Sequence, residues 1–132
     1  MTWLQPPGYV HVGITETWAE QTVAATAPAG LPFAAQLKID DPANRRLVLR
    51  AVNAANVSTT VDVELSGAKA KGGKLDVWVL SGSDLKQGNT AAEPKRISPK
   101  TSTGAAALAP GAASVSLHLP AFSFVIASLD LA

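Results

Sequence analysis

Alternation of apolar and polar residues is the dominant pattern of this chain, and it indicates β-strands. The alternation is clearest at residues 60–65, where Val, Val and Leu are separated by Thr, Asp and Glu. A period of two is typical of a strand with one buried and one solvated face. Similar alternation occurs at residues 37–39, 47–52, 75–80, 114–119 and 122–131. Counting shorter segments, the pattern predicts about eight strands.

Turn-forming residues separate these predicted strands. Asp40-Asp41-Pro42-Ala43-Asn44 has the composition of a turn, and we favour that interpretation over a calcium site. The Ala-rich segments 104–109 and 110–113 carry small side chains and are predicted to be connections. The sequence lacks the regular alternation of strands and helices that would indicate a parallel sheet. We therefore expect an all-β fold, an antiparallel β-sandwich of jelly-roll-like form, over residues 21–132.

Residues 1–20 form a separate N-terminal segment with a different pattern. Apolar residues recur there at helical spacing: Tyr9 or Val10, Ile14 and Trp18. Pro7 suits the first turn of a helix, where its missing N–H costs nothing. The β-branched residues of the same stretch also alternate, which is typical of an extended arm. We favour a short helix, with the extended arm as the alternative.

Composition narrows the classes of partner. The chain has 132 residues, a length typical of one domain, and a formal net charge of +1. Because charges of both signs are spread along the chain, nothing favours binding to nucleic acid or to an anionic membrane. We find neither a signal peptide nor an apolar run of the roughly 20 residues that span a bilayer. The compartment therefore stays open.

The sequence predicts no catalytic residue, metal site or cofactor. There is no Cys, and His11 and His118 are isolated, so no zinc set or catalytic triad can be assembled. Glycoside cleavage usually takes two carboxylates, and the chain has several. Asp62 and Glu64 share one strand face, but a solvated face is the simpler interpretation.

Aromatic residues are the remaining candidates for binding. Trp78 lies on the strand face opposite Leu75, and its ring is a candidate sugar platform because a ring face matches the apolar face of a sugar. For Trp78 we favour packing in a core or an interface, with the sugar platform as the alternative. The N-terminal segment is expected to contact a barrel or another partner through Trp3, Tyr9, Val10, Ile14 and Trp18.

Residues 87–99 are too long for a tight turn and too patterned for a floppy linker. Asn89 is expected to bond local backbone, while Pro94 and Pro99 keep the path out of helix. This segment is predicted to be an ordered, extended crossover with a structural role.

Three stretches together resemble one known family. They are WLQPPGYVHV at residues 3–12, LVLRAVN with VDVELSG at 47–53 and 61–67, and GNTAAEPKRISP with LHLPAFSFV at 88–99 and 117–125. Their order and spacing are similar to those in the C-terminal part of glycoside hydrolase family 51 α-L-arabinofuranosidases. The first stretch, in residues 1–20, resembles the end of that family's catalytic barrel, and the others resemble its β-sandwich. The resemblance spans essentially the whole chain.

The resemblance implies a role beside a catalytic domain. Members of that family join a (β/α)8 barrel, whose two catalytic Glu residues lie at strand ends, to a C-terminal β-sandwich. Neither catalytic motif occurs in this chain, and Glu16 and Glu20 match neither. The expected role is a non-catalytic sandwich that packs on and stabilises the barrel. The parent enzyme would release terminal arabinofuranose from arabinan or arabinoxylan.

The resemblance also bears on partners. It implies a fragment, a subunit or a processed piece of such an enzyme, bound to the barrel of the same protein or of a separate chain, and possible self-association into a homo-oligomer. Two alternatives stay open. One is a carbohydrate-binding module for arabinose-containing polysaccharide, and the other is a free-standing sandwich that binds proteins.

Overall fold

The computed structural model describes residues 3–41, 43–84, 86–108 and 110–132. Its elements are α1 (Pro6–Glu16), β1 (Gln21–Val23), β2 (Phe33–Asp41), β3 (Asn44–Asn53), β4 (Thr59–Glu64), β5 (Gly73–Ser81), β6 (Lys100–Leu108), β7 (Ser114–Leu119) and β8 (Ser123–Leu131). The strands form a six-stranded sheet in the order β1-β2-β3-β8-β5-β6 and a two-stranded sheet, β4-β7. All these pairings are antiparallel, which confirms the expected mainly β, sandwich-like fold.

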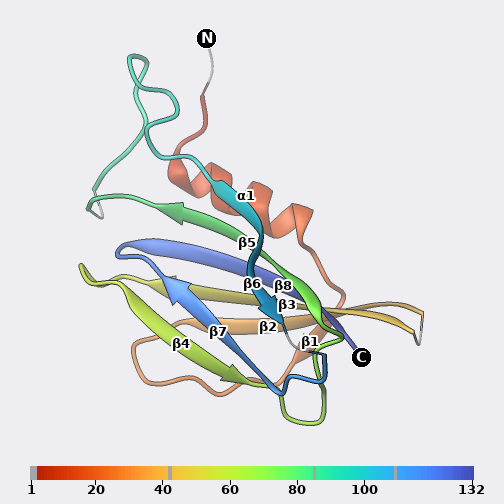
Figure 1. Cartoon of the computed structure of the whole chain (residues 1–132). Coiled ribbons are helices and arrows are strands. Elements are labelled where there is room, and N and C mark those ends of the chain that lie inside the picture. Colours follow the sequence, from red (N-terminus) through yellow and green to blue (C-terminus); the bar gives the residue numbers. More distant parts are fainter. Residues whose placement is uncertain (1–2, 42, 85, 109) are drawn as a thin grey trace.

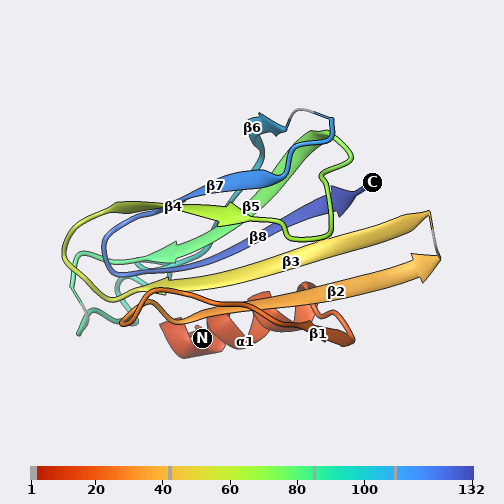
Figure 2. The same cartoon turned by 90° about the horizontal axis from the view of Figure 1, so that it is seen from below.

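The molecule has three layers. Figure 2 shows α1 on one side of the six-stranded sheet and the β4-β7 pair on the other. A larger core lies between the two sheets, and a smaller one lies between the six-stranded sheet and α1. The six-stranded sheet is therefore covered on both faces over its central strands.

Strand β8 lies in the middle of the larger sheet and is buried on both faces. Its residues Val125, Ala127 and Leu129 point into the core between the sheets, and Ile126 belongs to the core beneath α1. On one side β8 pairs with β3 and on the other with β5. Because successive residues face different apolar layers, residues 124–127 of this strand are all apolar.

Helix α1 confirms the helical interpretation of the N-terminal segment. Prolines occupy its first two positions, where a missing N–H is tolerated. The helix ends at Glu16 and is capped by Thr17, whose backbone N–H and hydroxyl both donate to the carbonyl of Gly13, at 3.2 and 2.7 Å. Residues 3–5 precede it as an extended arm, visible above α1 in Figure 1. Of the described residues, none lies in a helix long and apolar enough to cross a bilayer.

The prediction of a connection at residues 104–109 is wrong over its described part. Residues 104–108 belong to β6, and Leu108 and Ala107 pair with Gly73 and Lys74 of β5; residue 109 lies outside the described residues. Alanine and glycine have low strand propensity, so the residue types at these positions do not indicate a strand. The backbone ladder to β5 determines the structure here. Residues 110–113 form a connection, as expected.

The turn between β2 and β3 is built on Asp41. One of its carboxylate oxygens accepts from the Ala43 backbone N–H at 2.8 Å, and the other from the Asn44 side-chain amide at 2.7 Å. Both hydrogen bonds lower the pKa of Asp41, and the one from the Asn44 side chain has the larger effect. Both carboxylate oxygens are thus engaged in the turn itself.

Candidate functional site

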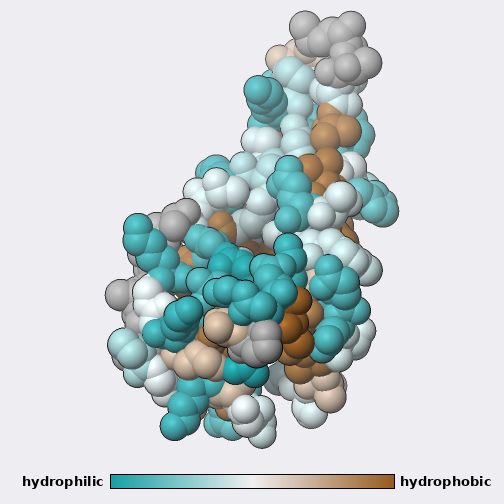
Figure 3. All heavy atoms as spheres, turned by 90° about the vertical axis from the view of Figure 1, so that its right-hand side faces the viewer, coloured by the Kyte–Doolittle hydropathy of each residue, from teal (hydrophilic) through white to brown (hydrophobic). Residues whose placement is uncertain are grey.

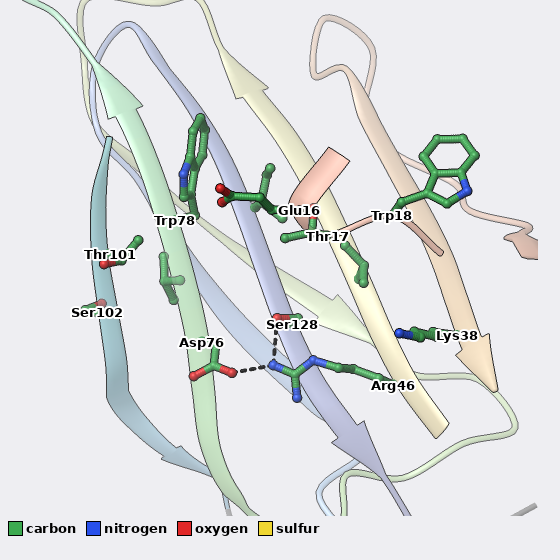
Figure 4. Close-up of a pocket in the computed structure, with 13 residues that line it drawn as sticks. Glu16, Thr17, Trp18, Lys38, Arg46, Asp76, Trp78, Thr101, Ser102 and Ser128 are labelled. Carbon is green, nitrogen blue, oxygen red and sulfur yellow. Dashed lines mark hydrogen bonds and ion pairs between the residues drawn. The ribbon is translucent and has the colours of Figure 1, made fainter. Parts of the chain in front are cut away.

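A groove of about 420 Å³ opens on the sheet face that carries α1, at the C-terminal end of that helix. Figure 4 shows its walls, formed by the helix end on one side and by strands of the six-stranded sheet on the other. Polar side chains line much of it: Glu16, Lys38, Arg46, Asp76, Thr101 and Ser128. Two tryptophans, Trp18 and Trp78, also contribute to its lining.

Arg46 organises the polar floor of the groove. Its guanidinium donates to Asp76 and, at 2.9 Å each, to the hydroxyl of Ser128 and to the carboxylate of Asp130. These residues come from three adjacent strands, β3, β5 and β8, whose pairing brings them onto one face. A guanidinium that bonds two carboxylates is held in a fixed orientation, so the floor of the groove is pre-ordered.

Arg50 fastens the end of α1 to the sheet. It is buried, and its guanidinium donates to the carbonyl and hydroxyl oxygens of Thr17, at 3.1 and 3.2 Å, and to the side-chain oxygen of Gln36. A cation placed at the carbonyl end of a helix is favourable because it complements the helix dipole. Burial lowers the pKa of Arg50, but its ordinary value is so high that the side chain stays charged.

Trp78 lies under α1 and is only 8% exposed. Its ring meets Phe124 edge-on, with centroids 5.9 Å apart. Gly13 of the helix lies directly above it, so a Cβ there would come within 2.8 Å of the ring. Core packing, the favoured interpretation, therefore describes most of this ring, while one part of it reaches the groove. The ligand-binding role of Trp78 stays a prediction.

A second cluster joins the N-terminal arm to residues 87–99 through Asn89, which is buried. Its side-chain amide donates to the carbonyls of Leu4 and Ile97, each at 2.8 Å, and its oxygen accepts from the Ile97 N–H at 2.6 Å. The Gln5 side chain bonds both the N–H and the carbonyl of Asn89, at 2.9 and 2.8 Å. We call this set the Asn89 clamp. It gives residues 87–99 the ordered structure that their pattern predicts.

The residues predicted to contact a partner divide into two groups. Tyr9 and Val10 are half-buried and pack on the small core beneath α1. Ile14 is also half-buried, whereas Trp3 and Trp18 are 37% and 57% exposed. Whether any of them meets a barrel or another partner stays a prediction.

The histidines and most carboxylates lie apart from the groove. His11 is exposed on α1, and His118 is exposed on β7, as its alternation predicts. Asp62 and Glu64 are exposed on β4, on the opposite side of the molecule from α1. Across the described parts of the chain, no group of three or more His, Cys, Asp or Glu residues is arranged to hold a metal ion.

Sequence reasoning missed Lys38 and Arg46 as lining residues. Each looks like an ordinary solvated strand position, and only the pairing of Lys38 with Arg46 across β2 and β3 places them together. Asp76 alternates with the apolar residues Leu75 and Val77 and likewise looks like a solvated strand position, so its partnership with Arg46 was not predicted. No signal in the sequence joins residues that are 30 positions apart on strands that do not pair with each other.

Comparison with solved structures identifies the same fold in several arabinofuranosidases. The arabinose-bound MgGH51 α-L-arabinofuranosidase matches with a TM-score of 0.76 and 18% identity, over 97% of this chain and 20% of that chain. A family 51 α-L-arabinofuranosidase from Bifidobacterium longum gives 0.63 and 22%, over 96% and 26%. The enzyme from Thermotoga maritima gives 0.60 and 19%, over 76% and 19%. This chain thus spans only about a fifth to a quarter of these proteins.

Comparison with protein families gives a match over most of the chain. Residues 3–123 match the family described as "Alpha-L-arabinofuranosidase C-terminal domain". No curated protein matches the chain significantly. The match includes α1, strands β1 to β7 and the Asn89 clamp, which agrees with the resemblance found in the sequence. The chain therefore belongs to the alpha-L-arabinofuranosidase C-terminal domain family.

Proposed function

We propose that this chain is the non-catalytic β-domain of an α-L-arabinofuranosidase, an enzyme that releases terminal arabinofuranose from arabinan or arabinoxylan. Its role is to pack on the catalytic barrel and stabilise it. The family match and the small share of each solved arabinofuranosidase that the chain covers support this proposal.

The observation that carries the packing role is the exposure of large apolar side chains on α1 and its arm. Trp3, Leu4 and Val12 are all exposed there. Figure 3 shows apolar residues at the surface of the upper part of the molecule, where the arm and α1 lie in Figure 1. Exposed apolar residues that gather on one element are typical of a protein interface.

The absence of a barrel from the described residues leads to the first prediction. We expect no release of p-nitrophenol when the purified chain is mixed with p-nitrophenyl α-L-arabinofuranoside. The groove does bring two carboxylates to its lining, Glu16 and Asp76, but Arg46 already binds Asp76. Hydrolysis above the buffer rate that disappears in a Glu16→Gln variant would contradict the non-catalytic role.

A second prediction tests the packing surface. The catalytic barrel of the same protein, supplied as a separate chain, is expected to bind this domain and to melt at a higher temperature in its presence. Leu4→Lys combined with Val12→Lys places two charges in the interface and should abolish both effects, because unpaired buried charges are costly. Binding by size-exclusion chromatography and melting by calorimetry measure the outcome.

The matched control is Val57→Lys. Val57 is the most exposed large apolar residue of those described, and it lies in the β3–β4 connection rather than on α1. This variant should bind the barrel as the unaltered domain does. The proposed surface would be overturned if the double variant bound the barrel as tightly as the unaltered domain. It would also be overturned if Leu4 and Val12 mediated self-association of the domain instead of binding to the barrel.

A further inference from the structure

We propose that the groove at the C-terminal end of α1 binds a neutral sugar chain, with Trp18 as its principal aromatic contact. This site goes beyond the proposed function, which assigns no ligand to the domain. It also lies at the other end of α1 from the arm that carries Trp3 and Leu4.

The aromatic component of the site is accessible. Trp18 stands at the rim of the groove, just after the helix, and is 57% exposed. In Figure 4 it lies on the opposite side of the groove from Trp78, with Glu16 and Thr17 between them. An exposed indole ring presents an apolar face that suits the C–H face of a sugar.

The charges of the lining indicate a neutral ligand. Lys38 and Arg46 contribute two positive charges, and Glu16 and Asp76 contribute two negative charges, so the formal charges cancel. A site for a phosphate or a carboxylated ligand would instead have an excess of cations. An uncharged polyol satisfies this lining better than an ion of either sign.

Both donors and acceptors in the groove remain available. Among the residues that the structure describes, the ion pair of Lys38 is a loose one with Asp40, at 3.9 Å. The Asp76 carboxylate uses one oxygen for Arg46, which leaves the other as an acceptor. Thr101, on the next strand, adds a hydroxyl on the same face. Sugar hydroxyls donate and accept at once, so they need such a mixed lining.

The size and rigidity of the groove agree with this ligand class. Its volume of about 420 Å³ lies near the lower end of the range of roughly 300–1,000 Å³ for small-molecule sites. That end of the range suits one or two sugar rings rather than a long segment. Because Arg46 is fixed by Asp76, Asp130 and Ser128, binding does not have to order the floor.

The test is an NMR titration of the isotope-labelled chain with α-1,5-arabinotriose and, separately, with xylotriose. At least one is expected to shift the indole N–H signal of Trp18 and the backbone amide of Thr101, with an affinity in the millimolar range. Trp18→Ala should weaken binding by about tenfold, as expected for loss of one stacked ring. Trp3→Ala removes another exposed tryptophan, outside the groove, and should leave the affinity unchanged.

The two sugars in this titration allow a failure of the proposed groove site to be distinguished from a failure of the proposed function. Binding of xylotriose alone supports the groove and gives no support to an arabinose-specific parent. No shift with either sugar, or equal affinity of the Trp18→Ala and unaltered chains, overturns the site. Neither result affects the barrel-binding experiment, which depends on Leu4 and Val12.

Discussion

Replacing Trp78 with alanine is expected to lower the free energy of unfolding by about 3–5 kcal/mol, the usual cost of removing a large buried aromatic side chain. The indole fills the layer between β5 and α1, where it packs with Val48, Ile126 and Phe124. Urea denaturation, followed by far-ultraviolet circular dichroism, measures both the stability and the loss of helix.

The control for this substitution is Trp18→Ala. Trp18 is another tryptophan of the α1 region but is largely exposed, so its loss should change stability by no more than about 0.5 kcal/mol. A Trp78→Ala chain as stable as the Trp18→Ala chain would show that α1 does not depend on the indole for its packing.

Gly13 supplies a sharper test of the same contact. A methyl group there would meet the Trp78 ring at 2.8 Å, closer than side chains pack. Gly13→Ala should therefore destabilise the unaltered chain by about 1–3 kcal/mol, and much less when Trp78 is already alanine. Additive effects of the two substitutions would contradict direct contact between helix and ring.

Asn89→Ala is expected to cost about 3 kcal/mol and to lower the melting temperature by about 10 °C, because it leaves buried backbone groups without hydrogen-bond partners. The substitution removes all three bonds that the Asn89 side chain makes, to Leu4 and Ile97. The arm and residues 87–99 should then become mobile together, which hydrogen exchange of the Ile97 amide would detect.

Two variants check that interpretation. Asn56→Ala alters an exposed asparagine and should leave the melting temperature nearly unchanged. Asn89→Asp keeps an oxygen for the Ile97 N–H but has no donor for the two carbonyls, and it buries a negative charge, so it should not restore stability. Normal exchange protection of Ile97 in Asn89→Ala would refute the clamp.

The β-strands with clear alternation could be predicted from the sequence because burial on one face leaves a period of two. Residues 60–65 and 114–119 show this, and both segments form strands of the smaller sheet. The β6 strand could not be predicted in the same way. Its partner is β5, and an edge position requires backbone hydrogen bonds from only one neighbour, so its own side chains carry little signal.

The groove was less predictable than the fold. Trp78 was identified as a residue on the face away from the main core, but the helix that covers it is fixed by tertiary packing. Arg46 and Asp76 come together only because β8 lies between their strands, and local pattern does not reveal strand order. The family could nevertheless be recognised from the sequence, because that resemblance rests on the order and spacing of three stretches of sequence. It does not require any single contact to be inferred.

The central position of β8 also determines when this domain can fold during synthesis. Leu49 of β3 and Val77 of β5 both pair with Ala127, so among the described strands the two halves of the large sheet are joined through β8, which follows all the others in the sequence. Contacts between residues so distant in sequence form slowly. Until residues 123–131 leave the ribosome, β3 and β5 each lack the strand that pairs with them there, and an unpaired strand edge of this kind favours aggregation.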